Sequence, residues 1–330
     1  MSLDGRILAQ AKSLLDEKRK RHEELLRSRI EKVYATAPNV GAIDSSIAET
    51  MSDLINLTLS PDSVVSFEDI RRKNIELQDK RRIEIIAAGF PGDYLDEEDM
   101  CPQCRDTGFK GAEICSCLMA LYKDAQKESL SSLLGITNNN TFDNFDLSFY
   151  DDTPISGHEI PPRRSMEIIY ETCVEYARKF GYKSMNLFFN GAPGLGKTFL
   201  SACIARVVAD NGYSVVYDTA ASVFAKFEDA KFMRTEDPEE ARTEVRRLTQ
   251  CDLLILDDLG TEMTTSFTVS ALYELVNTRL LTNRKTIISS NLALYELRNR
   301  YSEQIMSRLE GEYQVLTFRG TDIRKKKNAL

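Results

Sequence analysis

The segment from Asn190 to Thr198 has the residue types and the spacing of a phosphate-binding loop. Its sequence, Asn-Gly-Ala-Pro-Gly-Leu-Gly-Lys-Thr, matches the pattern G-x-x-x-x-G-K-[ST]. The glycines let successive N–H groups turn toward phosphate oxygens, and the following helix start adds a partial positive charge. We expect Lys197 to reach the β- and γ-phosphates of ATP and Thr198 to bind Mg²⁺. The predicted nucleotide contacts are Gly191, Ala192, Pro193, Gly194, Leu195, Gly196, Lys197, Thr198 and Phe199.

Two carboxylates end a second apolar segment. Residues 253–256 are Leu-Leu-Ile-Leu, and Asp257 and Asp258 follow them, as in a buried parallel strand that delivers acids at its C-terminal edge. We expect Asp257 to hold Mg²⁺, directly or through water, and Asp258 to orient or deprotonate the attacking water. The alternative for Asp258 is a helix cap or a solvated acid, and Glu262 is a weaker candidate for its role.

Three polar residues further along could complete a nucleotide site. Asn291 follows the apolar strand predicted at 286–290, and its amide could sense the γ-phosphate, although a turn would also suit an asparagine. Arg308 lies beside the apolar face of a predicted helix, and Arg324 follows the last predicted strand. Their guanidinium groups could stabilise transition-state charge if the site is completed across a subunit interface. Surface ion pairs are the alternative for both arginines.

Four cysteines near residue 100 have the spacing C-x2-C-x10-C-x-C. Four thiolates close together in a reducing compartment are better explained by a structural metal than by disulfides. We therefore expect a tetrahedral zinc site, with an iron–sulfur cluster or unliganded thiols as the alternatives. The expected ligands are Cys101, Cys104, Cys115 and Cys117.

The elements that must position these residues indicate two domains, which suits a chain of 330 residues. Short apolar strands alternate with helices in the second half, which predicts an α/β fold with a parallel sheet around the phosphate-binding loop. Amphipathic stretches at 7–34, 43–59 and 70–88 predict a mainly helical first part that carries the small zinc module. We expect a partner-interaction domain at 1–135, a linker at 136–162 and an ATPase domain at 163–330.

Charge limits the partners that such a chain can bind. The net charge is −8, and residues 1–150 carry 19 basic and 26 acidic side chains, so most of the excess is in the first part. Affinity for duplex DNA comes mainly from phosphate neutralisation, so any DNA contact must be local or completed by an oligomer or partner. No apolar run approaches a membrane span of ~20 residues, and the charged start does not suit a secretory signal. We therefore expect a cytoplasmic protein.

These motifs together resemble those of the AAA+ ATPases, and more narrowly those of the DnaC/DnaI-like replicative helicase loaders, with the IstB transposition helpers as close relatives. The resemblance covers roughly residues 140–327 and rests on GAPGLGKT, LLILDDLG, SSN, SEQIMSRL and TFRGTDIR. It implies that Arg308 is an arginine finger and Arg324 a second sensor. Asp258 departs from the wider superfamily, which more often has Glu there, but agrees with the loaders.

The resemblance also implies where DNA binds. The loop that contains Thr265 and Phe267 falls where loaders contact single-stranded DNA, and Phe267 could stack on a base. Its alternative is a helix start capped by one of the hydroxyl residues at 264–266. The segment 220–248 lies where loaders carry an extra DNA-facing element, and its basic residues could serve there or form a solvated face: Lys226, Lys231, Arg234, Arg246 and Arg247.

The function implied is an ATP-dependent loader that places a replicative hexameric helicase on single-stranded DNA and self-associates through its ATPase domain. Its cofactors would be ATP, Mg²⁺ and Zn²⁺. The alternatives are an IstB-like ATPase helper of a transposase and a nucleotide-dependent adaptor with little hydrolysis. We expect a transposition helper to lack the long acidic first part, and an adaptor to lack Asp257, Asp258 or Arg308, all of which are present.

Overall fold

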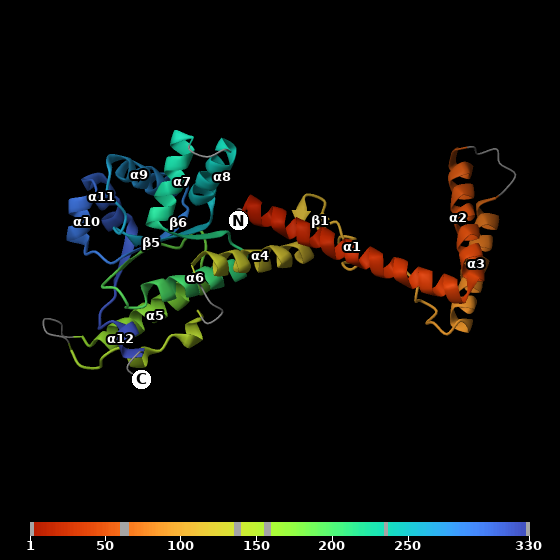
Figure 1. The fold of residues 1–330 in the computed structure, drawn as a ribbon, viewed down its shortest axis with the longest axis horizontal. Helices are drawn as coiled ribbons and strands as arrows, with labels where there is room; N and C mark the ends of the chain where they lie inside the picture. Colours follow the sequence, from red (N-terminus) through yellow and green to blue (C-terminus); the bar gives the residue numbers. More distant parts are fainter. Residues whose placement is uncertain (1–2, 60–65, 135–139, 155–159, 234–236, 328–330) are drawn as a thin grey trace. The chain divides into compact units, whose positions relative to one another are not determined.

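A computed structural model describes residues 3–59, 66–134, 140–154, 160–233 and 237–327 (Figure 1). It divides into two compact units. The N-terminal unit is Lys12–Leu118, and the sheet unit combines Met1–Ala11 with Met119–Leu330. The sheet unit therefore includes the first residues of the chain as well as most of helix α4 (Ser116–Leu134). The division at 135 and 162 that we expected from the sequence concerns function and stays a prediction.

The N-terminal unit is mainly helical, as its amphipathic stretches predicted. Its helices are α1 (Gly5–Thr36), which continues from the sheet unit, α2 (Pro38–Leu59) and α3 (Phe67–Ala87). The side chains of Val33, Val40, Ile85 and Leu95 form a small buried core. An ion pair of 2.6 Å between Arg81 on α3 and Asp44 on α2 lies beside it. A short antiparallel hairpin, β1 (Phe109–Lys110) and β2 (Glu113–Ile114), precedes α4.

The sheet unit is built on five parallel strands. They are β3 (Asn186–Asn190), β4 (Val215–Thr219), β5 (Leu253–Leu259), β6 (Lys285–Ser290) and β7 (Tyr313–Thr317). Their order across the sheet is β4-β5-β6-β3-β7, so β3 and β5 lie on either side of β6. Because parallel strands end at one edge, this order brings the phosphate-binding loop, the acidic pair and Asn291 together.

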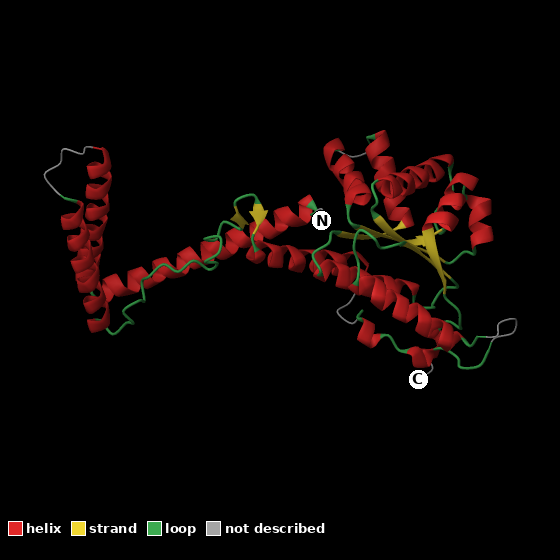
Figure 2. Ribbon diagram, turned by 180° about the vertical axis from the view of Figure 1, so that it is seen from behind, coloured by secondary structure: helices red, strands yellow, loops and turns green. Residues whose placement is uncertain are grey.

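Helices cover both faces of the sheet, which explains why its strands read as nearly continuous apolar runs (Figure 2). Successive strand residues point to opposite faces, so Leu187 and Phe189 join one core while Phe188 joins the other. The first core packs against α5 (Pro162–Arg178) and α6 (Lys197–Asp210). The second packs against α7 (Ala220–Phe232), α8 (Pro238–Gln250), α9 (Ser266–Leu281), α10 (Leu294–Arg300) and α11 (Glu303–Glu312).

Short elements complete the sheet unit. Two 3-10 turns, η1 (Phe142–Asn144) and η2 (Leu147–Phe149), precede α5, and a five-residue helix, α12 (Ile323–Lys327), follows β7. Among the helices that the structure describes, none has a stretch apolar and long enough to span a bilayer.

Candidate nucleotide site and cysteine cluster

The phosphate-binding loop connects β3 to α6, as the sequence predicted. Gly194 and Gly196 adopt left-handed φ angles of 77° and 88°, a conformation that side chains with a Cβ disfavour. Packing adds a second requirement for glycine at position 194, because a Cβ there would lie 1.9 Å from Oδ1 of Asp322. The loop also contacts residues 318–327, which we call the C-terminal segment. The N–H of Ile323 in that segment donates to the carbonyl of Gly194 at 3.0 Å.

Lys197 is 5% exposed and begins helix α6. Its Nζ donates to the carbonyls of Gly191 at 2.6 Å and Ala192 at 2.9 Å, and to Oδ1 of Asn291 at 2.7 Å. Burial lowers the pKa of Lys197 to about 8, although the nearby carboxylates of Asp258 and Asp257 oppose that shift. An anionic phosphate at this position would favour the charged form of the lysine.

The residues expected to hold magnesium also meet. The hydroxyl of Thr198, in the first turn of α6, donates to Oδ2 of Asp257 at the end of β5 at 3.0 Å. Asp257 is 3% exposed. A hydroxyl and a carboxylate are hard oxygen ligands of the type that Mg²⁺ takes from proteins, with nucleotide phosphates and water supplying the remainder. These two side chains therefore fit the ion in a phosphate-bound state.

Asp258 reaches the same place because strand β5 is irregular. Three residues of β5 advance against two of β6 between Leu256 and Leu259, which is a bulge. At the bulge Asp258 has a left-handed φ of 58°, a strained conformation for a residue with a side chain. A regular strand would turn two successive carboxylates to opposite faces, whereas the bulge re-aims the second one.

The side chain of Asn291 connects the carboxylate of Asp258 to the ammonium group of Lys197. Its Nδ2 donates to Oδ1 of Asp258 at 3.1 Å, while its Oδ1 accepts from Lys197. Burial and the carboxylate of Asp257 raise the pKa of Asp258. A carboxylate with a raised pKa is better suited to accept a proton from water than an ordinary surface acid. Asn291 thus connects the lysine of the phosphate-binding loop to the second carboxylate of the acidic pair.

A cavity of about 380 Å³, which we call the nucleotide cavity, opens over these residues. Its floor is the loop from Pro193 to Phe199, and Asp258, Asn291 and Arg324 contribute further along its wall. The other wall comes from the segment before α5, where Phe145 lies 5.8 Å from Phe199 between ring centroids. The phosphate-binding loop, Asp258 and Arg324 thus line the same cavity.

Two expected site residues lie elsewhere. Arg308, on α11, does not line the nucleotide cavity. Its guanidinium is held over the ring of Tyr273 at 4.7 Å and donates to Oδ1 of Asn277 at 2.8 Å, both on α9. Glu262, the weaker candidate, is buried, and its carboxylate accepts from the hydroxyl of Tyr301 and from the N–H of Gly260 at 2.9 Å.

The predicted DNA loop forms the start of α9. Thr265 caps that helix, with its hydroxyl accepting from the N–H of Thr268 at 3.1 Å, which agrees with the structural alternative for this residue. The ring centroids of Phe267 and of Phe232, the last residue of α7, lie 5.5 Å apart. Nζ of Lys231 lies 5.3 Å from the centroid of the Phe267 ring. Phe232 was not among the DNA contacts expected from the sequence, because it is distant from Phe267 along the chain. Only the fold shows that its side chain is 52% exposed.

The basic residues of segment 220–248 divide into different roles. Lys226 pairs with Asp218 at 2.6 Å, and Arg247 pairs with Asp4 at 2.6 Å, so these two are engaged within the sheet unit. Arg234 lies outside the described residues. Lys231 is the basic residue that accompanies the exposed Phe232 and the partly buried Phe267.

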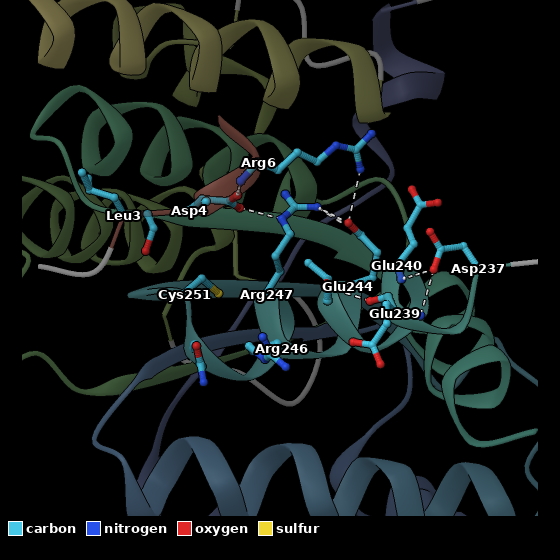
Figure 3. Close-up of a pocket in the computed structure, with 14 residues that line it drawn as sticks. Leu3, Asp4, Arg6, Asp237, Glu239, Glu240, Glu244, Arg246, Arg247 and Cys251 are labelled. Carbon is cyan, nitrogen blue, oxygen red and sulfur yellow. Dashed lines mark hydrogen bonds and ion pairs between the residues drawn. The ribbon is translucent and has the colours of Figure 1, made fainter. Parts of the chain in front are cut away.

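A larger cavity of about 650 Å³ lies between the start of the chain and α8 (Figure 3). Arg247 bonds there to Asp4 and to Glu244 at 3.0 Å, and Arg6 also reaches Glu244. It has no glycine-rich loop, and its carboxylates would repel phosphate. We therefore place the nucleotide in the smaller cavity.

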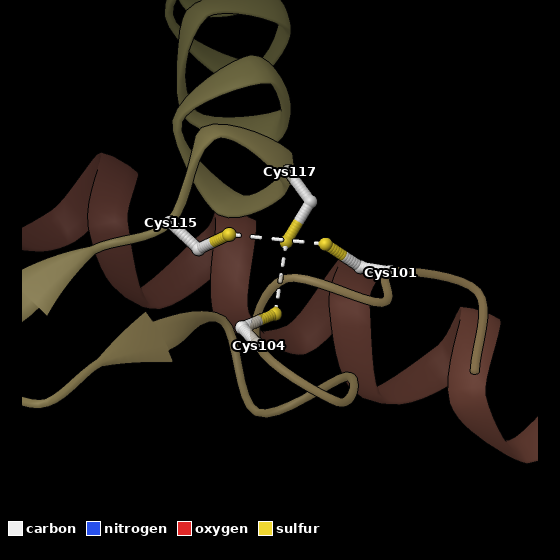
Figure 4. Close-up of side chains that lie close together, drawn as sticks. All are labelled: Cys101, Cys104, Cys115 and Cys117. Atoms are coloured by element: carbon white, nitrogen blue, oxygen red, sulfur yellow. Dashed lines mark hydrogen bonds between the residues drawn. The ribbon is translucent and has the colours of Figure 1, made fainter.

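The four clustered cysteines meet in the N-terminal unit (Figure 4). Their sulfur atoms all lie within 4.8 Å of one another, with Cys104 and Cys117 at 3.5 Å and Cys101 and Cys115 at 3.8 Å. Tetrahedral zinc with bonds of about 2.3 Å requires sulfur separations of roughly 3.8 Å, so the arrangement fits that ion. The carboxylate of Asp106 accepts from the N–H of Cys101 at 2.7 Å and fixes the first ligand loop.

Comparison with known proteins identifies the sheet unit. Residues 175–330 match the family of IstB-like ATP binding proteins. The sheet unit is therefore similar to IstB-like ATP binding proteins and to DnaC helicase loaders. The replicative helicase loader DnaC of Buchnera aphidicola subsp. Baizongia pistaciae is 29% identical over 153 residues, which are 46% of this chain and 61% of the relative. DnaC of Escherichia coli K12 is 26% identical over 135 residues, covering 41% and 54%.

Two solved structures match part of this chain. The crystal structure of the DnaC helicase loader has 18% identity and a TM-score of 0.43, covering 54% of this chain and 98% of that chain. AMPPCP-bound DnaA from Aquifex aeolicus has 23% identity and a TM-score of 0.45, covering 59% and 55%. The chain thus spans about half to three fifths of the length of the DnaC relatives that it matches in sequence. The match to the IstB-like family begins at residue 175, so it does not include the N-terminal unit and its cysteines.

Proposed function

We propose that this protein is an ATPase that loads a ring-shaped replicative helicase onto single-stranded DNA. The observation that carries the ATPase part is the chain of bonds from Lys197 through Asn291 to Asp258, which connects the phosphate-binding loop to the acid beside Asp257. Nucleotide and Mg²⁺ would bind over this chain, and Asp258 would accept the proton of the attacking water. The match to proteins named as replicative helicase loaders supports the choice of partner.

Single-stranded DNA would bind at the pair formed by Phe232 and Phe267. Two neighbouring aromatic rings with a lysine beside them provide base stacking and attraction to phosphate without requiring a basic protein overall. Met263, which is 82% exposed, extends the apolar surface. This local site suits a chain whose net charge is −8.

The helicase would bind the N-terminal unit, within the partner-interaction domain that we place at 1–135. Helix α3 exposes Ile75, Ile83 and Ile86 by 49%, 65% and 54%. Their spacings of eight and three residues put them on one stripe of a helix that is otherwise highly charged. Exposed isoleucines on one stripe are typical of a surface that a protein partner covers.

We also propose that the four cysteines bind zinc and that Arg308 acts on ATP held by a second copy of this chain. Tyr273 and Asn277 hold the guanidinium of Arg308 outside its own nucleotide cavity, which is the arrangement that action in trans requires. The zinc would fix the ligand loops before α4 and so contribute to the stability of the N-terminal unit.

A transposase is the second candidate partner, because the family match is to IstB-like proteins. The deciding experiment adds purified replicative helicase or transposase from the same genome to the full chain and to an Ile83→Ser variant. We expect ATP-dependent delivery of the helicase to single-stranded DNA, which Ile83→Ser weakens without changing ATP binding. Binding of the transposase alone would replace the loader by the transposition helper, and binding of nucleotide without turnover would favour the adaptor.

A further inference from the structure

The carboxylate of Asp257 is held by four donors. Oδ2 accepts from the hydroxyl of Thr198 at 3.0 Å and from the phenol of Tyr217 at 2.8 Å. Oδ1 accepts from the hydroxyl of Ser289 and from the N–H of Asp258 at 3.2 Å. Thr198 and Asp258 belong to the phosphate-binding loop and the acidic pair, which the sequence already assigned to the site. Tyr217 lies in no motif, and the SSN segment singled out Asn291 but gave Ser289 no role.

These two additional donors come from the strands on either side of Asp257. Tyr217 is on β4 and Ser289 is on β6, and β5 runs between them. Tyr217 pairs in register with Ile255, which lies two residues before Asp257 on β5. Residues two apart on a strand share a face, so the side chains of Tyr217 and Asp257 both point to the α6 face of the sheet. Both hydroxyl-bearing side chains are fully buried. The carboxylate of Asp257 is thus held by hydroxyl donors from both strands that neighbour β5.

We propose that Tyr217 and Ser289 are positioning residues that set the orientation of the Asp257 carboxylate toward magnesium. This inference rests on the proposed ATPase function. A carboxylate can rotate about its Cβ–Cγ bond, and one that is free to do so must be ordered when the ion binds. Donors from two strands fix that rotation beforehand, because neither strand can move without disturbing the sheet. The hydroxyl of Thr198 can donate to Asp257 and still offer its lone pair to the ion.

Two properties of Tyr217 favour this role over simple filling of the core. Its phenol donates to Oδ2 of Asp257 at 2.8 Å, a directed contact that filling of the core does not require. Its ring is packed in the core formed with α6, the helix that carries Lys197 and Thr198. The ring fixes the distance between that helix and the acid, while the hydroxyl fixes the carboxylate. A phenylalanine at this position would keep the spacing between the helix and the acid but would lose the hydrogen bond that orients the carboxylate.

The test replaces Tyr217 by phenylalanine in the full chain and measures binding of a fluorescent ATP analogue as Mg²⁺ is added. Removing an outer partner of a metal ligand typically costs 10- to 100-fold in metal affinity. We expect the half-saturating Mg²⁺ concentration to rise roughly 10-fold, with binding in EDTA changed by less than about 2-fold. Turnover should fall at limiting Mg²⁺ and recover as Mg²⁺ is raised. Ser289→Ala should act in the same direction, and Ser289→Thr, which keeps a hydroxyl, should restore the wild-type midpoint.

The matched control is Tyr176→Phe, because the hydroxyl of Tyr176 is buried without a hydrogen-bond partner among the described residues. It should leave the Mg²⁺ midpoint unchanged. An unchanged midpoint in Tyr217→Phe, or an equal loss of binding with and without Mg²⁺, would overturn the proposal. If Tyr217→Phe does not fold, the two Ser289 variants decide in its place. Wild-type protein that binds no nucleotide at all would refute the proposed function instead.

Discussion

Replacing Gly194 by alanine tests whether the C-terminal segment holds the phosphate-binding loop. The new Cβ meets two obstacles, a left-handed φ of 77° and the carboxylate of Asp322 at 1.9 Å. The first costs about 1 kcal/mol. The carboxylate can swing away, but it then loses the hydrogen bond in which its Oδ1 accepts from the N–H of Arg324 at 2.9 Å, worth about 1 kcal/mol.

The expected loss is therefore about 2 kcal/mol for Gly194→Ala in the wild-type background and about 1 kcal/mol when Asp322 is already alanine. For a unit of this size these values correspond to a fall in melting temperature of roughly 4–8 °C and 2–4 °C. Calorimetry would follow the transition that shifts upward with ATP, which identifies the sheet unit. ATP affinity should also fall in Gly194→Ala, because Arg324 moves together with Asp322.

Gly311→Ala provides the control, since a Cβ at Gly311 on α11 has open space and the substitution should stabilise by roughly 0.5–1 kcal/mol. The reasoning is refuted if Gly194→Ala costs the same in both backgrounds. That result would mean that backbone strain accounts for the whole effect and that Asp322 does not restrain the loop.

Three further outcomes are expected. Asp258→Asn should retain ATP binding and abolish most turnover, measured as phosphate release, and unchanged turnover would remove Asp258 from the mechanism. Elemental analysis should find about one zinc per chain, absent in Cys104→Ser but retained in Cys203→Ser, whose thiol is buried on α6 away from the cluster; a metal-free wild type would contradict the site. Mixing Arg308→Ala with Lys197→Ala chains should restore some hydrolysis through mixed interfaces, and no rescue in proven mixed oligomers would assign Arg308 a structural role.

The sequence by itself determined the local features of this protein. The phosphate-binding loop, the strand that ends in Asp257 and the four-cysteine spacing each depend on residues a few positions apart, so their chemistry is readable without a fold. The strands predicted at 253–256 and 286–290 agree with β5 and β6 within a few residues, because both strands are buried on both faces. Each of these inferences needs only the geometry of one turn or one strand.

Only the tertiary structure decided which distant side chains join the site. Asp258 turns toward Asn291 because β5 bulges against β6, whereas strand periodicity would have sent it to the opposite face. Tyr217 reaches Asp257 across 40 positions because β4 lies next to β5. The same holds for Phe232, which meets Phe267, and for Arg247, which is held by Asp4 near the chain start. Strand order and helix packing set these contacts, and a single sequence carries no local signal for either.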